Sequence, residues 1–165
     1  MLKGSRSLRV GILGMIGILL ITSGMSLAES PDKLLCKNLQ SFYDLWKDAA
    51  FGNDPNRTEK AAWVILTPEG SYSFQLWPAS GARNSQIWRG PIPDHSVALV
   101  HTHTVIMDEK PSHRDILVAQ KLAIILYVIS SKGIWSVAPS GQEEKERGTE
   151  WLRDAECNSE ESLTK

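Results

Sequence analysis

The stretch VALVHTHTVIMDEKPSHRDI, residues 97–116, decides how this chain is expected to fold. It begins as an apolar run with a period-two pattern, which is typical of a buried β-strand. Residues two apart on a strand point to the same face, so His101 and His103 are expected side by side. Ser112 then opens a predicted helix, and Asp115 lies in its first turn. If that helix returns across the end of the strand, the Asp115 carboxylate comes to the two imidazoles.

Two imidazoles and one carboxylate can hold a zinc ion and leave the fourth tetrahedral position open for water, as in catalytic sites. Each residue also has a structural explanation. Ser112 and Asp115 are of the types that cap the start of a helix, and either histidine alone is explained by its neighbours in the strand. The combination favours a metal site, because an apolar strand has no packing reason to place two ionisable rings on one face.

The other elements follow from apolar periodicity and turn residues on either side of this stretch. Apolar residues three and four apart predict an amphipathic helix over residues 32–50. Two hairpins are predicted, with strands over 60–67 and 71–78 and over 123–130 and 134–139. Residues 79–96 have no clean period and are expected to form a loop near the site. The sequence therefore predicts an α+β domain with helices at both ends of a modest, largely antiparallel sheet.

Length and charge limit the functions that the chain can have. Its 165 residues suit one domain of ordinary globular composition. Three of the 18 basic residues lie in an N-terminal leader without acids, which leaves 15 basic against 19 acidic residues in the rest of the chain. That remainder is acidic and has no basic, aromatic patch, so nucleic acid is excluded as a partner.

The leader, residues 1–28, is expected to be a secretory signal peptide. A basic start precedes an apolar core over residues 10–22, and Ser26 and Ala28 stand three and one residues before the expected cleavage point. An uncleaved membrane anchor is the alternative, since residues 10–28 are close to the roughly 20 needed to span a bilayer. Glycines within the apolar core favour cleavage, so a secreted or periplasmic protein is expected.

Export affects how the two cysteines, Cys36 and Cys157, are interpreted. They lie near opposite ends of the mature chain, and neither has metal-binding spacing. In an oxidising compartment, such a pair is more often a disulfide than two free thiols. The predicted bridge would join the first helix to the charged C-terminal tail, in which a short helix is considered over residues 149–157.

The motif of two histidines, then eight residues, then SHRD resembles the JAMM signature of the JAB/MPN metallohydrolases. In that signature, a His-x-His pair is followed by about seven residues and Ser-x-x-Asp. PSHRDILVAQKL and YVISSKGIWSVAPSG are also similar to stretches of bacterial RadC-like proteins and prokaryotic JAB-type domains. The resemblance implies a cytidine-deaminase-like, JAB-type fold with a mostly antiparallel mixed sheet flanked by helices. The resemblance covers residues 56–141, about half the chain. With the leader and the first helix, the expected division is a signal peptide (1–28), an N-terminal helix (29–55), a JAB-like domain (56–141) and a charged tail (142–165).

The resemblance also implies residue roles. His101, His103 and Asp115 would be ligands of Zn²⁺, and Ser112 would help to hold the oxyanion or the bound water. Two features depart from the family pattern: the gap before Ser112 has eight residues rather than seven, and Thr104 stands where proline is usual. An insertion of one residue in a loop costs little.

The family also needs a glutamate upstream to carry protons. Glu59, just before the strand that begins near residue 60, fits that place best, and Glu69 in the PEG turn is the competitor. Trp88 and Arg89, in the irregular stretch QIWRGP, are expected to border a substrate groove. His95 and His113 are expected to be surface residues; the alternative is that they tune the surroundings of the site, with His113 as a hydrogen-bond donor to it.

The resulting hypothesis is an exported, zinc-dependent hydrolase that cleaves a peptide or isopeptide amide bond in a peptide or protein substrate. The alternative is a catalytically inactive module of the same fold that binds a partner protein. Association with a membrane is expected only if the leader is not cleaved. The sequence leaves both the identity of the substrate and the oligomeric state open.

Overall fold

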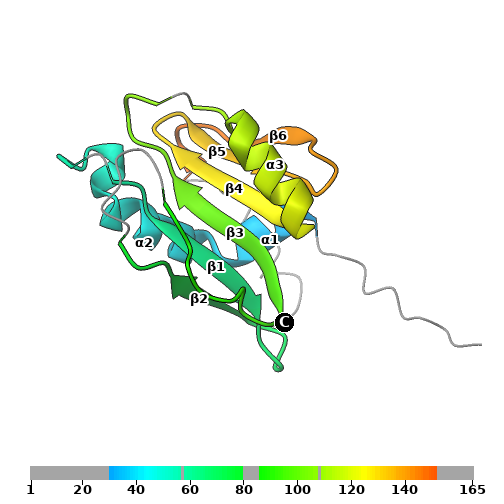
Figure 1. Cartoon of the computed structure of the whole chain (residues 1–165). Coiled ribbons are helices and arrows are strands. Elements are labelled where there is room, and N and C mark those ends of the chain that lie inside the picture. The colour runs from blue at the N-terminus through cyan, green and yellow to red at the C-terminus, as the bar shows by residue number, and fades with distance from the viewer. Residues whose placement is uncertain (1–29, 57, 80–85, 108, 152–165) are drawn as a thin grey trace, which may run out of the picture.

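The computed structural model describes residues 30–56, 58–79, 86–107 and 109–151 (Figure 1). The predicted signal peptide and Cys157 lie outside these ranges, so cleavage and the disulfide stay predictions. Most of the short helix considered over residues 149–157 also lies outside them. Within the described ranges, no helix combines the length and the apolar character needed to cross a membrane.

Three helices and six strands make up the described part of the chain. They are α1 (Pro31–Lys37), α2 (Leu39–Asp48), β1 (Ala61–Leu66), β2 (Tyr72–Leu76), β3 (Ser96–Thr102), α3 (His113–Leu122), β4 (Ile125–Ser130), β5 (Gly133–Val137) and β6 (Glu143–Arg147), with a 3₁₀ turn η1 (Ala50–Gly52) after α2. The predicted α+β class and both predicted hairpins are confirmed.

The strands form one mixed sheet in the order β2-β1-β3-β4-β5-β6. Four of the five neighbouring pairs are antiparallel, as the sequence predicts, and β3 and β4 are parallel. A parallel pair needs a long crossover connection, because its second strand must start again at the same end of the sheet. The crossover here contains α3, which packs against β4 and β5 and whose first turn brings Asp115 to His101 near the end of β3.

Alternation along the strands divides the core between two faces of the sheet. Ala98 and Val100 of β3 pack with residues of α1 and α2, whereas Leu99 packs with Trp63 of β1 and with Ala119 of α3. In Figure 1, α3 lies in front of the sheet and α1 and α2 lie behind it. His101 follows Leu99 by two residues, so its side chain is on the α3 face.

The prediction of one continuous helix over residues 32–50 is wrong, because the helix breaks at Asn38. The backbone of Asn38 is not helical (φ −123°, ψ 15°), and its side-chain amide donates to the carbonyl of Leu34 at 2.7 Å. Asparagine often competes in this way with the regular helical hydrogen bonds. The chain therefore forms two short helices that both cover the same face of the sheet.

The second difference is β6, which lies inside the segment predicted to be a charged tail. Its sequence, EEKER, has no apolar residue, and the strand pairs antiparallel with β5 at one edge of the sheet. An edge strand needs little burial, and charges there prevent pairing with other chains. Apolar periodicity therefore gives no signal for it. Arg147, its last residue, is buried and forms an ion pair with Asp32 of α1.

Candidate metal centre

His101 and His103 lie at the end of β3, on the α3 face of the sheet. His101 pairs with Val128 of the parallel strand β4, and the amide of His103 donates to the carbonyl of Ile129 at 2.8 Å. Both side chains are buried, with 8% and 2% of their residue surfaces exposed. The pairing with β4 thus holds the backbone at both histidines, so both side chains leave the chain toward the same face of the sheet.

Asp115 is held by a capping box at the start of α3. The Asp115 amide donates to the Ser112 hydroxyl oxygen at 3.3 Å, and the Ser112 amide and hydroxyl both donate to Asp115 Oδ2 at 2.7 Å. The structural explanation of these two residues is therefore confirmed. It does not compete with the metal explanation, because the box fixes the carboxylate in the position where it meets the histidines.

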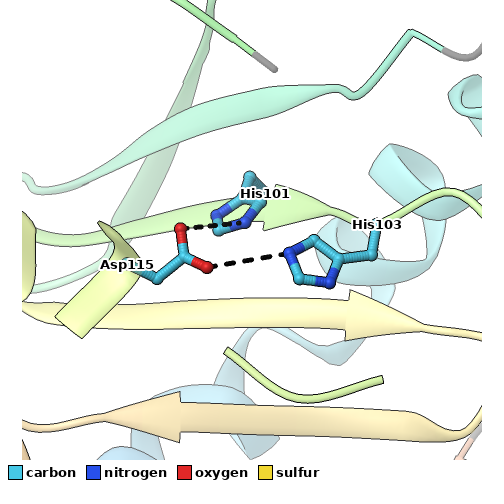
Figure 2. A group of neighbouring side chains, drawn as sticks. All are labelled: His101, His103 and Asp115. Carbon is cyan, nitrogen blue, oxygen red and sulfur yellow. Dashed lines mark ion pairs between the residues drawn. The ribbon is translucent and has the colours of Figure 1, made fainter. Parts of the chain in front are cut away.

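The three side chains meet in a compact group (Figure 2). His101 Nε2 lies 3.5 Å from Asp115 Oδ1, and His103 Nε2 lies 3.7 Å from Asp115 Oδ2. One ligand atom from each residue lies within 4.8 Å of the others. Ligand atoms of a tetrahedral zinc ion with bonds of about 2.0–2.1 Å stand about 3.3 Å apart. The group therefore has nearly the spacing that a metal ion requires and can bind one.

The extra residue in the connection after His103 does not separate Asp115 from the rings. Thr104, where the family pattern has proline, is buried. The next residue, Val105, donates its amide to the carbonyl of Gly52 at 3.0 Å, which ties the connection to the segment after α2. This hydrogen bond holds the start of the connection, and the distances from Asp115 to both imidazoles show that the longer connection still lets the carboxylate reach them.

Glu59 stands next to this group because the pairing of β1 with β3 continues beyond the strands. Ala61 pairs with His101. One residue further out, the Lys60 amide donates to the Thr102 hydroxyl and the Thr102 amide donates to the Lys60 carbonyl, both at 2.9 Å. Continued by one more residue, this register sets Glu59 opposite His103. In contrast, Glu69 is exposed in the β1–β2 turn.

The electrostatics of the group follow from its burial. Burial raises the pKa of Glu59 from 4.5 to about 7, and Asp115 adds to this rise while His103 and Arg114 oppose it. Burial also lowers the pKa of His101 to about 4, against the attraction of Asp115. Burial alone would raise the pKa of Asp115, but hydrogen bonds from His103 and Ser112 and the charge of His101 bring it below its ordinary value. A neutral imidazole and an ionised carboxylate are the forms that bind metals.

The group opens into a cavity of about 330 Å³. Glu59, Ser112 and Trp88 are among its lining residues, as expected for a site with an adjacent groove. Arg89 is exposed and is not among them. The cation in the lining is Arg114. It was not predicted from the sequence, although its position directly before Asp115 in the first turn of α3 indicates that it lies close to the site.

The remaining residues of the sequence analysis lie elsewhere. His95 and His113 are exposed, as expected. Cys36 is half-buried on α1, where its sulfur accepts a hydrogen bond from Arg147 at 3.1 Å. No family model matches the chain, and no curated protein matches it either.

Proposed function

We propose that the protein is a zinc-dependent hydrolase of the JAMM type, with a JAB-like, cytidine-deaminase-like fold, that cleaves a peptide or isopeptide amide bond. The observation that carries this proposal is the buried Glu59 beside the group of His101, His103 and Asp115. A structural site has four protein ligands, whereas this group supplies three and borders a cavity. A carboxyl with a pKa near 7 suits a residue that both takes and returns a proton at neutral pH.

The donor set supports zinc as the ion. Two imidazole nitrogens and one carboxylate oxygen are ligands that Zn²⁺ takes in hydrolytic sites, whereas Mg²⁺ and Ca²⁺ prefer oxygen ligands alone. Bound zinc would lower the pKa of coordinated water toward about 7 and polarise the scissile carbonyl.

The chain's own residues then have distinct tasks. Glu59 accepts the proton of the attacking water and delivers it to the leaving amine nitrogen. The Ser112 hydroxyl lines the cavity and donates to Asp115 Oδ2; to hold the oxyanion, it would turn this proton from the carboxylate to the substrate oxygen. Asp115 keeps its orientation because the Ser112 amide also holds it. Arg114 lies where it can meet negative charge on the substrate.

The leader supports export as part of the same proposal, which makes the mature protein secreted or periplasmic. Expression with the leader and determination of the N-terminus of the product test this part. A mature chain that starts at Glu29 supports it, whereas a retained Met1 supports an anchor instead.

The function itself is tested with two glutamate variants. The full chain is refolded with Zn²⁺, its metal content is measured, and hydrolysis of a mixed peptide pool is followed by mass spectrometry. Glu59→Gln should keep close to one zinc per chain and lose hydrolysis, while the matched control Glu69→Gln should behave as the wild type. Less than about half an equivalent of zinc in the wild type counts against the site. Bound zinc without hydrolysis favours a binding module of the same fold.

A further inference from the structure

The cavity extends from the metal group to a cluster of three indoles, Trp63, Trp77 and Trp88. Each ring contacts the other two, with centroid distances of 5.3 Å for Trp63 and Trp77, 5.9 Å for Trp63 and Trp88, and 5.5 Å for Trp77 and Trp88. The rings come from β1, from the residue after β2, and from the segment before β3. This indole cluster therefore forms an apolar end of the same cavity that holds Glu59.

The sheet register explains why the space between the cluster and the metal group stays open. The Trp77 amide donates to the carbonyl of Ala61 at 2.8 Å, and Ala61 pairs with His101 on its other side. Trp77, Ala61 and His101 thus form one row across the sheet on the α3 face. The middle residue of that row has only a methyl side chain and lines the cavity. An indole and an imidazole consequently stand on either side of a gap.

Most of the other lining residues are also apolar. Aliphatic side chains come from β3, β4, α3 and the segment before β3: Ile92, Leu99, Val118, Leu122 and Leu126. Gln86 is a polar exception, and its side-chain amide donates to the carbonyl of Glu59. The ionisable residues in the cavity lining belong to the metal group and its neighbours, Glu59 and Arg114. A charged side chain at the indole end would lose its water without gaining a partner. A large uncharged side chain would bury its apolar surface there.

The indole N–H groups give a second observation. Trp88 Nε1 donates to the carbonyl of Pro91 at 2.9 Å. The Nε1 atoms of Trp63 and Trp77 are buried, and among the described residues neither has an acceptor. Buried donors in native proteins are almost always paired, so such groups call for an explanation. Both rings line the cavity, but neither N–H faces its open space, so it is the apolar faces and edges of the rings that a ligand meets.

We propose that the indole cluster is a specificity subsite that receives one large apolar side chain, with aromatic side chains preferred, from the residue next to the scissile amide. This inference rests on the proposed hydrolase function. A cavity of about 330 Å³ is at the small end of ligand sites and takes a single side chain rather than a long segment. Substrates with glycine or alanine at that position leave the subsite empty and are poor substrates.

The first test measures specificity in the zinc-loaded full chain. Two peptide series are used that differ only by phenylalanine or alanine on either side of the cleaved bond. The ratio of kcat/KM for the better phenylalanine peptide over its alanine counterpart should be at least about tenfold. In Trp88→Ala, that ratio should fall to within about twofold of unity. Trp135→Ala is the matched control, since Trp135 is a half-buried indole on β5 outside the cavity lining, and it should keep the ratio.

The second test measures binding without catalysis. N-acetyl-phenylalaninamide and N-acetyl-alaninamide are titrated calorimetrically into the metal-free wild type and into Trp88→Ala and Trp77→Phe. The phenylalanine compound should bind the wild type at least about tenfold more tightly, and both variants should weaken it. Trp77→Phe keeps an aromatic ring with a smaller apolar surface, so it reports on the ring contact even if the alanine variant folds poorly.

The two tests separate this inference from the function on which it rests. Binding of the phenylalanine compound without any peptide hydrolysis overturns the hydrolase and keeps the subsite. Hydrolysis with equal kcat/KM for both peptide series, together with equal binding of the two amides, overturns the subsite and keeps the hydrolase.

Discussion

Glu59 and His103 stand opposite each other where the antiparallel pairing continues beyond the first residue of β1 and the last residue of β3. Neither residue is in a strand, and 44 positions of sequence separate them in the chain. Their neighbours Lys60 and Thr102 are joined by two hydrogen bonds, from the Lys60 amide to the Thr102 hydroxyl and from the Thr102 amide to the Lys60 carbonyl. The proposed proton carrier and one proposed metal ligand are thus positioned by a single structural device.

Removal of a ligand should abolish stable metal binding. His101→Ala and Asp115→Asn each leave two of the three groups, so zinc affinity should fall by more than the roughly 10–100-fold that loss of a supporting hydrogen bond costs. Competition with a chromogenic chelator measures this. The control is His95→Ala, because His95 is exposed before β3. Equal zinc affinity in His101→Ala and the wild type would show that the ion binds elsewhere.

Loss of the Ser112 cap should weaken both the helix and the metal site. Ser112→Ala removes the hydroxyl that accepts a hydrogen bond from the Asp115 amide and donates one to the Asp115 carboxylate. The free energy of unfolding should fall by about 0.5–2 kcal/mol, and zinc affinity should fall by about 10–100-fold. Ser30→Ala is a matched control, because Ser30 caps α1 through the Lys33 amide. It should lose stability and keep zinc affinity.

The pKa of Glu59 predicts an unusual pH dependence in the metal-free protein. Its carboxyl has an ordinary pKa of 4.5 when unfolded and about 7 when folded, so the folded state binds more protons between these values. The free energy of unfolding therefore loses up to about 3 kcal/mol as the pH rises from 4.5 to 7. Glu59→Gln should remove this loss, so the free energy of unfolding of the variant should rise relative to that of the wild type as the pH increases across that range.

Urea unfolding at several pH values between 4 and 8 checks this prediction. The pKa of His101 is lowered to about 4, so its contribution changes in the opposite direction between pH 4 and 6.5. The difference between the wild type and the variant at each pH is therefore the quantity to compare. A constant difference across the range would contradict the burial of an ionisable carboxyl at this position.

The predicted Cys36–Cys157 bridge is testable without a structure. Intact mass measurement before and after reduction should show two hydrogens gained, and Cys36→Ser and Cys157→Ser should lower stability equally. Loss of a bridge that closes so long a loop typically costs about 2–5 kcal/mol. Unequal losses, with free thiol in the unreduced wild type, would contradict the pairing.

The local features of the site were predictable from the sequence, because each is encoded by neighbouring residues. The period of two in β3, continued one residue past its end, places His101 and His103 on one face, and the Ser112 cap fixes where α3 begins. The preference for Glu59 over Glu69 came from the resemblance, which implies a glutamate at the edge of an early strand, and from the turn that explains an acid at residue 69.

Features that depend on distant contacts were not predictable in the same way. The parallel pairing of β3 with β4 is decided by how α3 packs, and the apolar pattern of either strand is compatible with both directions. β6 was not predicted, because it is stabilised by pairing with β5 and by the ion pair of Arg147 with Asp32 rather than by apolar residues. The row of Trp77, Ala61 and His101 requires the register of three strands, which a single sequence does not give.

Ligands of the proposed ion lie at both ends of the connection from β3 to α3: His101 and His103 before it, and Asp115 just after Ser112. If these three residues bind an ion, the first turn of α3 would be linked to the end of β3, and the connection between them would become a closed loop. Loss of the ion would remove that link while the hydrogen bonds of the sheet remain. Amide hydrogens in the first turns of α3 should therefore exchange with solvent faster after chelation, and those of β4 and β5 should change little.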